Sequence, residues 1–246
     1  MPAANAAAPV KKNSNFQAIV KRLFQNRGAV IGLIIFIVLA LAAIFAPVAA
    51  PYGYEEMDLT NMLSGPSLEH LFGTDELGRD VFSRIIYGGR YSLSIGLAAT
   101  AFGAVVGCAI GAITGYFGGT LDTVLMRFLD ILEAIPGLLL TICVSAVLGS
   151  GIITRYVLPN SLSPVIVKAT MSVALTILTA ASLSYVGLGV QPPTPEWGAM
   201  LSAGRAYIRS YPHLIMFPGI FIMITVLGLN LFGDGLRDAL DPKLKK

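Results

Sequence analysis

A single uninterrupted apolar segment near the N-terminus restricts the fold of this chain more than any other feature. Residues 28–50, GAVIGLIIFIVLALAAIFAPVAA, contain no charged side chain. At 1.5 Å per residue, a helix of this length crosses the ~30 Å hydrocarbon core of a bilayer. The composition agrees, because 55% of the 246 residues are hydrophobic and only 13% are charged, which is unusual for a soluble domain. The sequence therefore predicts an all-α, polytopic membrane helix bundle.

Basic residues at both ends predict the orientation of the chain. The basic residues before the first span are Lys11, Lys12, Lys21, Arg22 and Arg27, with no acidic residue among them. By the positive-inside rule we expect residues 1–27 to be a cytoplasmic segment and 28–50 an uncleaved first transmembrane helix. The alternative is a cleaved signal peptide, for which the small residues of 46–50 would supply the site. The basic tail, 233–246, is likewise expected in the cytoplasm, and the net charge of +3 is too small to suggest nucleic acid.

Residues 51–90 predict an extracytoplasmic loop followed by an amphipathic helix. Residues 51–70 are polar and rich in turn formers. After them, Val81, Phe82, Ile85 and Ile86 recur at helical spacing on the face opposite Arg79, Ser83 and Arg84. We predict a helix lying in the plane of the membrane interface, with a local ion pair between Asp80 and Arg84. The residues singled out in this interfacial motif are Gly73, Asp75, Gly78, Arg79, Asp80 and Arg84.

The stretch 91–232 is predicted to be the transmembrane core. It holds four further apolar runs, at about 91–117, 121–149, 163–186 and 213–232. The first of these carries glycines at four-residue intervals, which remove the side chains from one helix face and let a neighbouring backbone approach. These glycines are Gly103, Gly107, Gly111 and Gly115. Between the last two runs, Trp197 and Tyr207 are predicted to be interface anchors.

The number of apolar runs conflicts with the charge pattern. A chain with both ends in the cytoplasm crosses an even number of times, but the sequence contains five runs. A sixth crossing near Gly151 would move Arg155 and the C-terminal tail to the cytoplasmic side. Arg205 and Arg209 would then lie outside. Two alternatives stay open: the third run enters the membrane and returns, or the C-terminus lies outside.

Four motifs resemble those of a known family. They are GTDELGRDVFSRIIYGGR (73–90), RYVLPNSLSP (155–164), LSYVGLGVQPPTPEWGAML (183–201) and GLNLFGDGLRDALDPKL (228–244). They are similar to the permease subunits of bacterial dipeptide, oligopeptide and nickel ABC importers, specifically to the second, C-type permease of each pair. The resemblance extends from about residue 21 to residue 246.

This resemblance implies a type I ABC importer permease fold with six spans in the bacterial inner membrane. The implied partners are a homologous second permease, two ATP-binding subunits and an extracytoplasmic solute-binding protein that docks near residues 51–70 and 191–211. Transport would proceed by alternating access, with ATP and Mg²⁺ used by the partner subunits. This chain would then bind no cofactor or metal and carry no catalytic residue. The sequence agrees, since it contains no GxxxxGK[ST], HExxH or GxSxG motif.

The chain departs from the family pattern at one place. The family has a cytoplasmic Glu-Ala-Ala loop before the RYVLPN motif, whereas here only Glu133-Ala134-Ile135 comes close, followed at once by Pro136. The resemblance places a join at Gly151/Ile152, where one span and the coupling loop are missing. Arg155, Pro159 and Asn160 would then lie on the ATPase-coupling side, although Pro159-Asn160 is equally explained as a helix boundary.

Three functions follow from these observations. The first is an ABC permease subunit for peptides or related solutes, and the second is an internally deleted, transport-inactive form of it. The third is a self-sufficient channel or secondary transporter, for which a charge at mid-membrane depth would be expected and none of the runs provides one.

Overall fold

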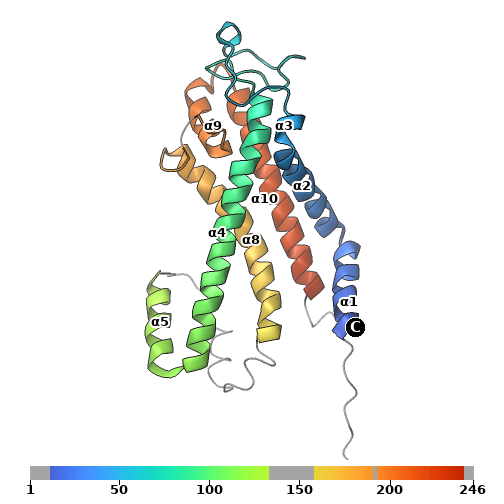
Figure 1. Cartoon of the computed structure of the whole chain (residues 1–246), viewed down its shortest axis with the longest axis vertical. Helices are drawn as coiled ribbons and strands as arrows, with labels where there is room; N and C mark the ends of the chain where they lie inside the picture. The colour runs from blue at the N-terminus through green and yellow to red at the C-terminus, as the bar shows by residue number, and fades with distance from the viewer. Residues whose placement is uncertain (1–11, 133–157, 191–192, 241–246) are drawn as a thin grey trace, which may run out of the picture.

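The computed structural model describes residues 12–132, 158–190 and 193–240. Long helices form a bundle that is capped at one end by an irregular loop (Figure 1). The helices are α1 (Lys12–Gln25), α2 (Arg27–Ile44), α3 (Ala46–Ala49), α4 (Val81–Phe117), α5 (Gly119–Leu132), α8 (Leu158–Tyr185), α9 (Trp197–Gly204) and α10 (His213–Leu240), with 3-10 turns η1 (Leu59–Asn61) and η3 (Arg205–Tyr207). The described residues contain no strand, so the predicted all-α fold is confirmed.

Four helices are long and apolar enough to cross a membrane. These segments are Arg27–Ile44, Val81–Thr114, Val165–Tyr185 and His213–Leu240. Most of their side chains face outward, and only 11% of the most apolar window in α4 is buried, which suits helices surrounded by lipid. The predicted third run, 121–149, continues beyond α5 outside the described residues. The structure therefore identifies four of the five predicted spans.

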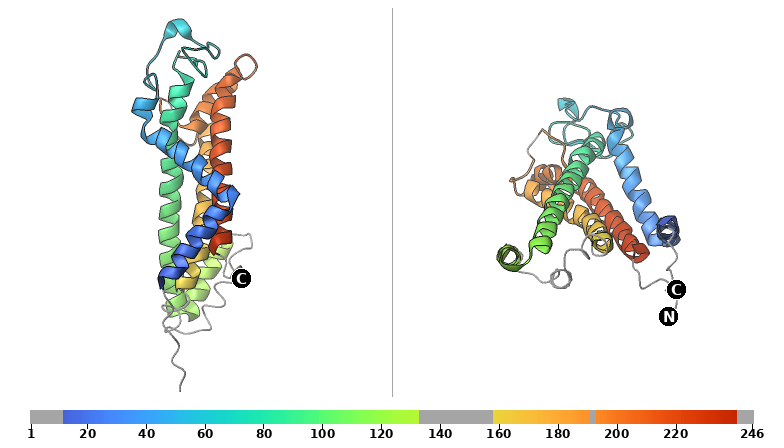
Figure 2. Two further views of the ribbon diagram at one scale, coloured as in Figure 1. Left: turned by 90° about the vertical axis from the view of Figure 1, so that its right-hand side faces the viewer. Right: turned by 60° about the horizontal axis from the view of Figure 1, so that its bottom comes forward.

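The four spans alternate in direction. α2 and α8 run toward the loop end of the bundle, and α4 and α10 run away from it (Figures 1 and 2). The end of α4 and the start of α8 consequently lie at the same end of the bundle. α1 lies at that end too, where the Asn26 amide donates to Asp238 near the end of α10 at 3.3 Å.

The interfacial helix predicted within 81–90 does not exist as a separate element. α4 runs unbroken for 37 residues from Val81 to Phe117, so the boundary drawn between residues 90 and 91 falls inside one helix. Nothing between these positions interrupts the backbone, since the segment holds no proline. Arg79 and Arg84 did not mark a solvent-facing side, because both are buried beneath the loop.

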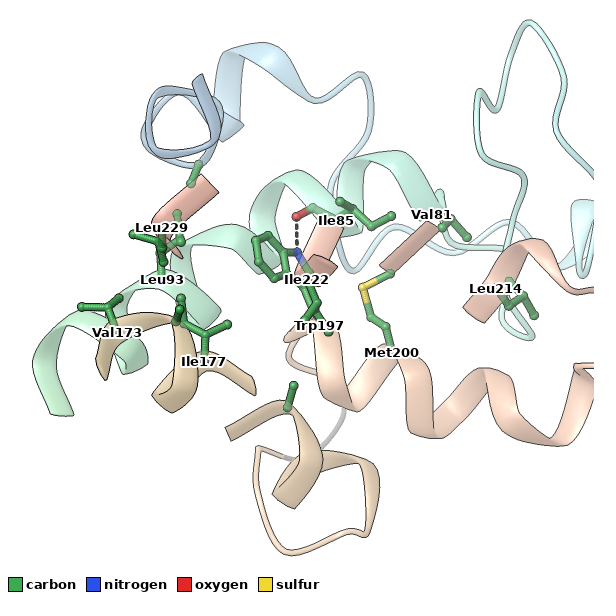
Figure 3. Packing of buried hydrophobic residues seen from close by; sticks show 13 residues of the cluster. Val81, Ile85, Leu93, Val173, Ile177, Trp197, Met200, Leu214, Ile222 and Leu229 are labelled. Atoms are coloured by element: carbon green, nitrogen blue, oxygen red, sulfur yellow. Dashed lines mark hydrogen bonds between the residues drawn. The ribbon is translucent and has the colours of Figure 1, made fainter. Parts of the chain in front are cut away.

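The hydrophobic core lies in the loop-side half of the bundle, where α4, α8, α9 and α10 meet (Figure 3). Trp197 of α9 is at its centre and is 1% exposed. Its indole Nε1 donates to the carbonyl of Ile85 on α4 at 2.9 Å. The prediction that Trp197 anchors the chain at the membrane interface is therefore wrong, because its polar edge is satisfied by protein. Tyr207 packs against the same core while partly buried.

Close contacts at glycine join α2 to α10. A Cβ at Gly228 would lie 2.7 Å from Ile35 Cγ2, and a Cβ at Gly32 would overlap the Gly228 carbonyl. Arg90 of α4 secures the other end of α2, because its guanidinium donates to the carbonyls of Ala43 (2.7 Å) and Ile44 (2.6 Å). The last carbonyls of a helix lack the usual partner four residues further on, and Arg90 donates to two of them in α2 and so ties α2 to α4.

Candidate functional site

A buried charge network fixes the loop onto the top of α4. At its centre, Asp75 accepts the backbone N–H groups of Leu77 (2.9 Å) and Arg79 (3.0 Å) on Oδ1. Its Oδ2 accepts Arg79 Nε at 2.7 Å and lies 3.6 Å from Arg84 Nε. Glu76 adds a weaker, more exposed contact to Arg79 at 3.3 Å. The carboxylate of Asp75 thus compensates two cations that are 3% and 4% exposed.

The second acidic residue of the motif, Asp80, starts α4. Its Oδ2 accepts the backbone N–H of Ser83 at 2.7 Å, which is a helix N-cap. Its Oδ1 lies 3.0 Å from Nδ1 of His70, which must donate because an ionised carboxylate only accepts. The predicted ion pair between Asp80 and Arg84 is absent. Arg84 instead pairs with Asp75 and donates to the carbonyl of Tyr54 at 3.1 Å.

The two motif glycines make the close turns that this network needs. Gly78 has φ +72°, and a Cβ there would overlap the carbonyl of Asp58. Gly73 has φ +78°, and a Cβ there would lie 2.8 Å from Nε2 of His213 on α10. Both positions require glycine, because an L side chain is strained at such φ values and no space is left for it. The loop backbone can therefore lie directly against α10.

Aromatic stacking attaches the loop to α10 as well. Phe72 stacks on Phe217 with ring centroids 4.0 Å apart and an angle of 9° between the planes, and it meets the edge of Phe82 on α4 at 5.1 Å.

Earlier in the loop, Asp58 caps η1. Hydrogen bonds from the side chain of Thr60, and then from Asn61, lower the pKa of Asp58 below its usual value.

A second buried network joins α9 to α4. Glu196 caps α9 by accepting the N–H of Ala199 at 2.9 Å, and its other oxygen accepts the hydroxyl of Ser92 at 3.2 Å. Ser92 in turn accepts the N–H of Trp197 at 3.3 Å. We use the term outer cap for residues 51–80 together with α9, since the two networks hold these segments against α4 and the Phe72 stack holds the loop against α10.

Two cavities adjoin this assembly. One, of about 20 Å³, lies between Asp75, Arg84, Met200 and Leu214 and has room for a single water. The other is an open groove of about 650 Å³ between α8 and α10, lined by apolar side chains such as Leu178, Ile222 and Met223, with Asn230 at one side. Among the described residues, no group of three or more His, Cys, Asp or Glu is placed to hold a metal ion.

The predicted glycine stripe on α4 does not pack within the described part of this chain. No atom lies within 4 Å of a Cβ built at Gly103, Gly107 or Gly111, and the surroundings of Gly115 are outside the described residues. The glycines of α4 that do meet neighbours are nearer its start. A Cβ at Gly88 would lie 3.0 Å from Trp197 Cδ1, and one at Gly89 would lie 3.2 Å from Ala43 Cβ.

The residues predicted on the coupling side are only partly described. Arg155 lies outside the described residues, whereas Pro159 and Asn160 lie in the first turn of α8. Proline is well tolerated there, because the first turn of a helix leaves its N–H groups unpaired in any case.

Sequence reasoning missed several residues that build the outer cap. Tyr54, His70, Ser92 and Glu196 all contact it through the hydrogen bonds described above. Their partners lie 10 residues away for His70, 30 for Tyr54 and 104 for the pair Ser92 and Glu196. Glu196 immediately precedes a tryptophan and a helix, and that N-cap position is the one signal that could have identified it.

The fold and this assembly define a class: an integral membrane helix bundle in which a compact cap holds the helix ends on one side. Two family matches, one near each end of the chain, agree with this class. Residues 14–66 match the N-terminal TM domain of oligopeptide transport permease C, and residues 150–246 match the binding-protein-dependent transport system inner membrane component. The chain belongs to this family of inner-membrane transport permeases, and the resemblance stated from the sequence motifs is confirmed.

Individual relatives align over almost the whole chain. The dipeptide transport system permease protein of Alkalihalophilus pseudofirmus is 41% identical over 277 positions, covering 94% of this chain and 91% of the relative. The glutathione transport system permease proteins of Escherichia coli and Shigella boydii are 41% identical over 271 positions, covering 92% of this chain and 89% of each relative.

These alignments are longer than the chain itself. Coverage of 94% of 246 residues amounts to about 231 residues, so about 46 of the 277 aligned positions hold a residue in the dipeptide permease and a gap here. The second family match begins at residue 150, next to the join that the motifs placed at Gly151/Ile152.

Proposed function

We propose that this chain is the C-type permease subunit of an ABC importer for peptides or related small solutes such as glutathione. The observation that carries the proposal is the 41% identity with dipeptide and glutathione permeases over nearly the full length of both chains. The subunit forms half of the translocation pathway together with a homologous permease. It is not catalytic and binds no cofactor, since ATP and Mg²⁺ act in the two ATP-binding subunits.

The outer cap is the surface that receives the solute-binding protein. Its two buried networks support this role, because a docking surface transmits a partner's movement only if it is rigid and joined to the spans behind it. Asp75 and Glu196 provide those joints to α4, and the stack of Phe72 on Phe217 provides one to α10. In this orientation both termini lie in the cytoplasm, at the end of the bundle opposite the cap.

The chain lacks a span and its coupling loop at Gly151/Ile152. The end of α4 and the start of α8 lie on one side of the bundle, so a complete permease needs an even number of crossings between these two helices. One apolar run, 121–149, supplies a single crossing. About 46 residues, the length missing against the dipeptide permease, provide a second crossing of ~20 residues and a cytoplasmic loop.

This absence predicts that the chain assembles poorly or does not couple transport to ATP. A coupling loop acts by making contacts whose free energy differs between the two transport states, and without it ATPase closure has no contact through which to move this subunit. The same chain with the segment of a relative inserted after Gly151 should transport.

The test compares three forms of the chain, each expressed with its partner permease, ATPases and binding protein. The first is the chain as it stands, the second carries the full ~46-residue insert, and the third carries only an apolar span of ~20 residues with a flexible loop of matched length. We expect ATP-dependent peptide uptake only from the second, and co-purification of the ATPases to be strongest with it. Equal uptake from all three forms would disprove the missing coupling loop. Uptake from none, without ATPase co-purification, would count against the permease function itself.

A further inference from the structure

α1 is an amphipathic helix that the sequence did not reveal. Ile19, Val20 and Leu23 are half-buried, while Gln17 and Lys21 are exposed. α1 packs against the end of α10. Its axis runs in a different direction from that of α2 (Figure 2). The change of direction occurs at Asn26, whose extended backbone (φ −81°, ψ 107°) and side chain cap the start of α2. The polar face of α1 is thereby turned away from the bundle.

The polar face of this junction is strongly basic. The first 54 residues contain five Lys or Arg and no Asp or Glu. Within the described residues, Lys21, Arg22 and Arg27 form no ion pair. Asp238 accepts from Asn26, and Asp234 and Arg237 also lie near the end of α10. Lys21 and Arg27 are exposed and Arg22 is half-buried, so Lys21 and Arg27 are fully open, and Arg22 partly open, to an anionic partner from outside the chain.

The depth of the junction is fixed by α2. Its 18 residues span about 27 Å, close to the thickness of the hydrocarbon core, so Arg27 lies at one boundary of that core. Lys21, Arg22 and Phe24 are within two turns of this boundary, at the level of the lipid headgroups. Phe24 is 59% exposed and presents a large apolar side chain where headgroups and acyl chains meet.

We propose that the junction of α1 and α2 binds anionic phospholipid headgroups. Lys21, Arg22 and Arg27 hold the phosphates, and Phe24 enters the outermost layer of the acyl chains. This combination of cationic face and apolar anchor is what an interfacial helix needs to select anionic lipid. The proposal depends on α2 spanning a membrane and is independent of the transported solute and of the missing span.

Local lipid composition at residue 24 tests the proposal. The full chain carrying Phe24→Trp is placed in vesicles of phosphatidylcholine and phosphatidylglycerol at one fixed ratio, with quenching bromines on either one lipid or the other. Trp197 is the single native tryptophan and is buried, so the unsubstituted chain gives the background. We expect stronger quenching by brominated phosphatidylglycerol than by an equal mole fraction of brominated phosphatidylcholine.

Charge variants assign the preference to this junction. K21Q/R22Q should lower the enrichment of phosphatidylglycerol by up to about fivefold for each cation removed, and high salt should lower it in the unmodified F24W chain. The charge-matched control R205Q/R209Q removes two exposed cations from the capped end. It should leave the enrichment of phosphatidylglycerol at residue 24 unchanged. Equal quenching by the two lipids would overturn the proposal, as would a preference that survives both K21Q/R22Q and high salt. Each charge variant is also made with the native Phe24, and there unaltered emission of Trp197, the single tryptophan, shows that the variant is folded.

Discussion

Replacing Asp75 by Asn should release the outer cap from α4. The substitution keeps the shape of the side chain and the Oδ1 acceptor, so the turn hydrogen bonds to Leu77 and Arg79 can persist. It removes the charge that faces Arg79 Nε at 2.7 Å and Arg84 Nε at 3.6 Å. Both cations stay buried, and leaving a buried charge without its partner costs about 3–5 kcal/mol.

Glu76→Gln is the matched control for this prediction. Glu76 contacts the same arginine, but at 3.3 Å and with 26% of its side chain exposed, so its loss should cost less than about 1 kcal/mol. The free energy of unfolding can be measured by SDS titration in mixed micelles, with Trp197 as the fluorescent reporter. Trp197 suits this because it is hydrogen-bonded to α4 at Ile85, the residue next to Arg84 of the network.

A double-mutant cycle identifies the interaction responsible. Arg79→Gln alone leaves Asp75 without its nearest cation and should also be strongly destabilising. D75N/R79Q buries neither of these charges. Its loss of stability should therefore be smaller, by at least about 1 kcal/mol, than the sum of the losses in D75N and R79Q. If D75N costs no more than E76Q, or if the two single effects simply add, the buried network does not hold the cap in place.

Three further outcomes are expected. Gly78→Ala should make the loop sensitive to limited proteolysis, because φ is +72° and the new Cβ meets a carbonyl, whereas Gly65→Ala, with open space around it, should not. Gly228→Val should lower the unfolding midpoint by separating α10 from α2, while Gly107→Val should leave the midpoint of the isolated chain unchanged; equal effects would contradict the described packing. Hydrogen bonds lower the pKa of Asp58 in the folded loop. The contribution of Asp58 to loop order should therefore be complete above the pKa of the unfolded chain, about 4. It should be lost as the pH falls through the lower pKa of the folded state. Pepsin cleavage of the loop across this range should show the step, and Asp58→Asn should abolish it.

The sequence predicted the parts of this fold that depend on local composition. Apolar runs located the four described spans, because length and hydropathy alone decide whether a helix can cross a bilayer, although α4 begins ten residues before the predicted run and α10 ends eight residues after it. The motifs in 73–90 and 183–201 identified the family. Charges and glycines were harder to interpret, since their effect depends on what lies opposite them.

Arg84 shows why the outer cap escaped prediction. An arginine at the start of an apolar helix is typical of a solvent-facing side, yet Arg84 is buried because Asp75 and the carbonyl of Tyr54 reach it from the loop. Trp197 was misinterpreted for the same reason, since its partner is the Ile85 carbonyl 112 residues away. The glycine stripe at 103–111 leaves one face of α4 without side chains, but no neighbour within the described residues packs against it, because periodicity carries no information about what lies opposite a face.

The continuity of α4 gives the bundle a mechanical property. At 1.5 Å per residue, its 37 residues form a rod of about 55 Å, clamped at one end by Asp80, Arg84 and the indole of Trp197. A tilt of only about 10° at the clamped end sweeps the opposite end through about 10 Å, as follows from that length. A small rotation of the outer cap would thus be amplified into a large displacement at the far end of α4, as long as the unbroken helix moves as one rod.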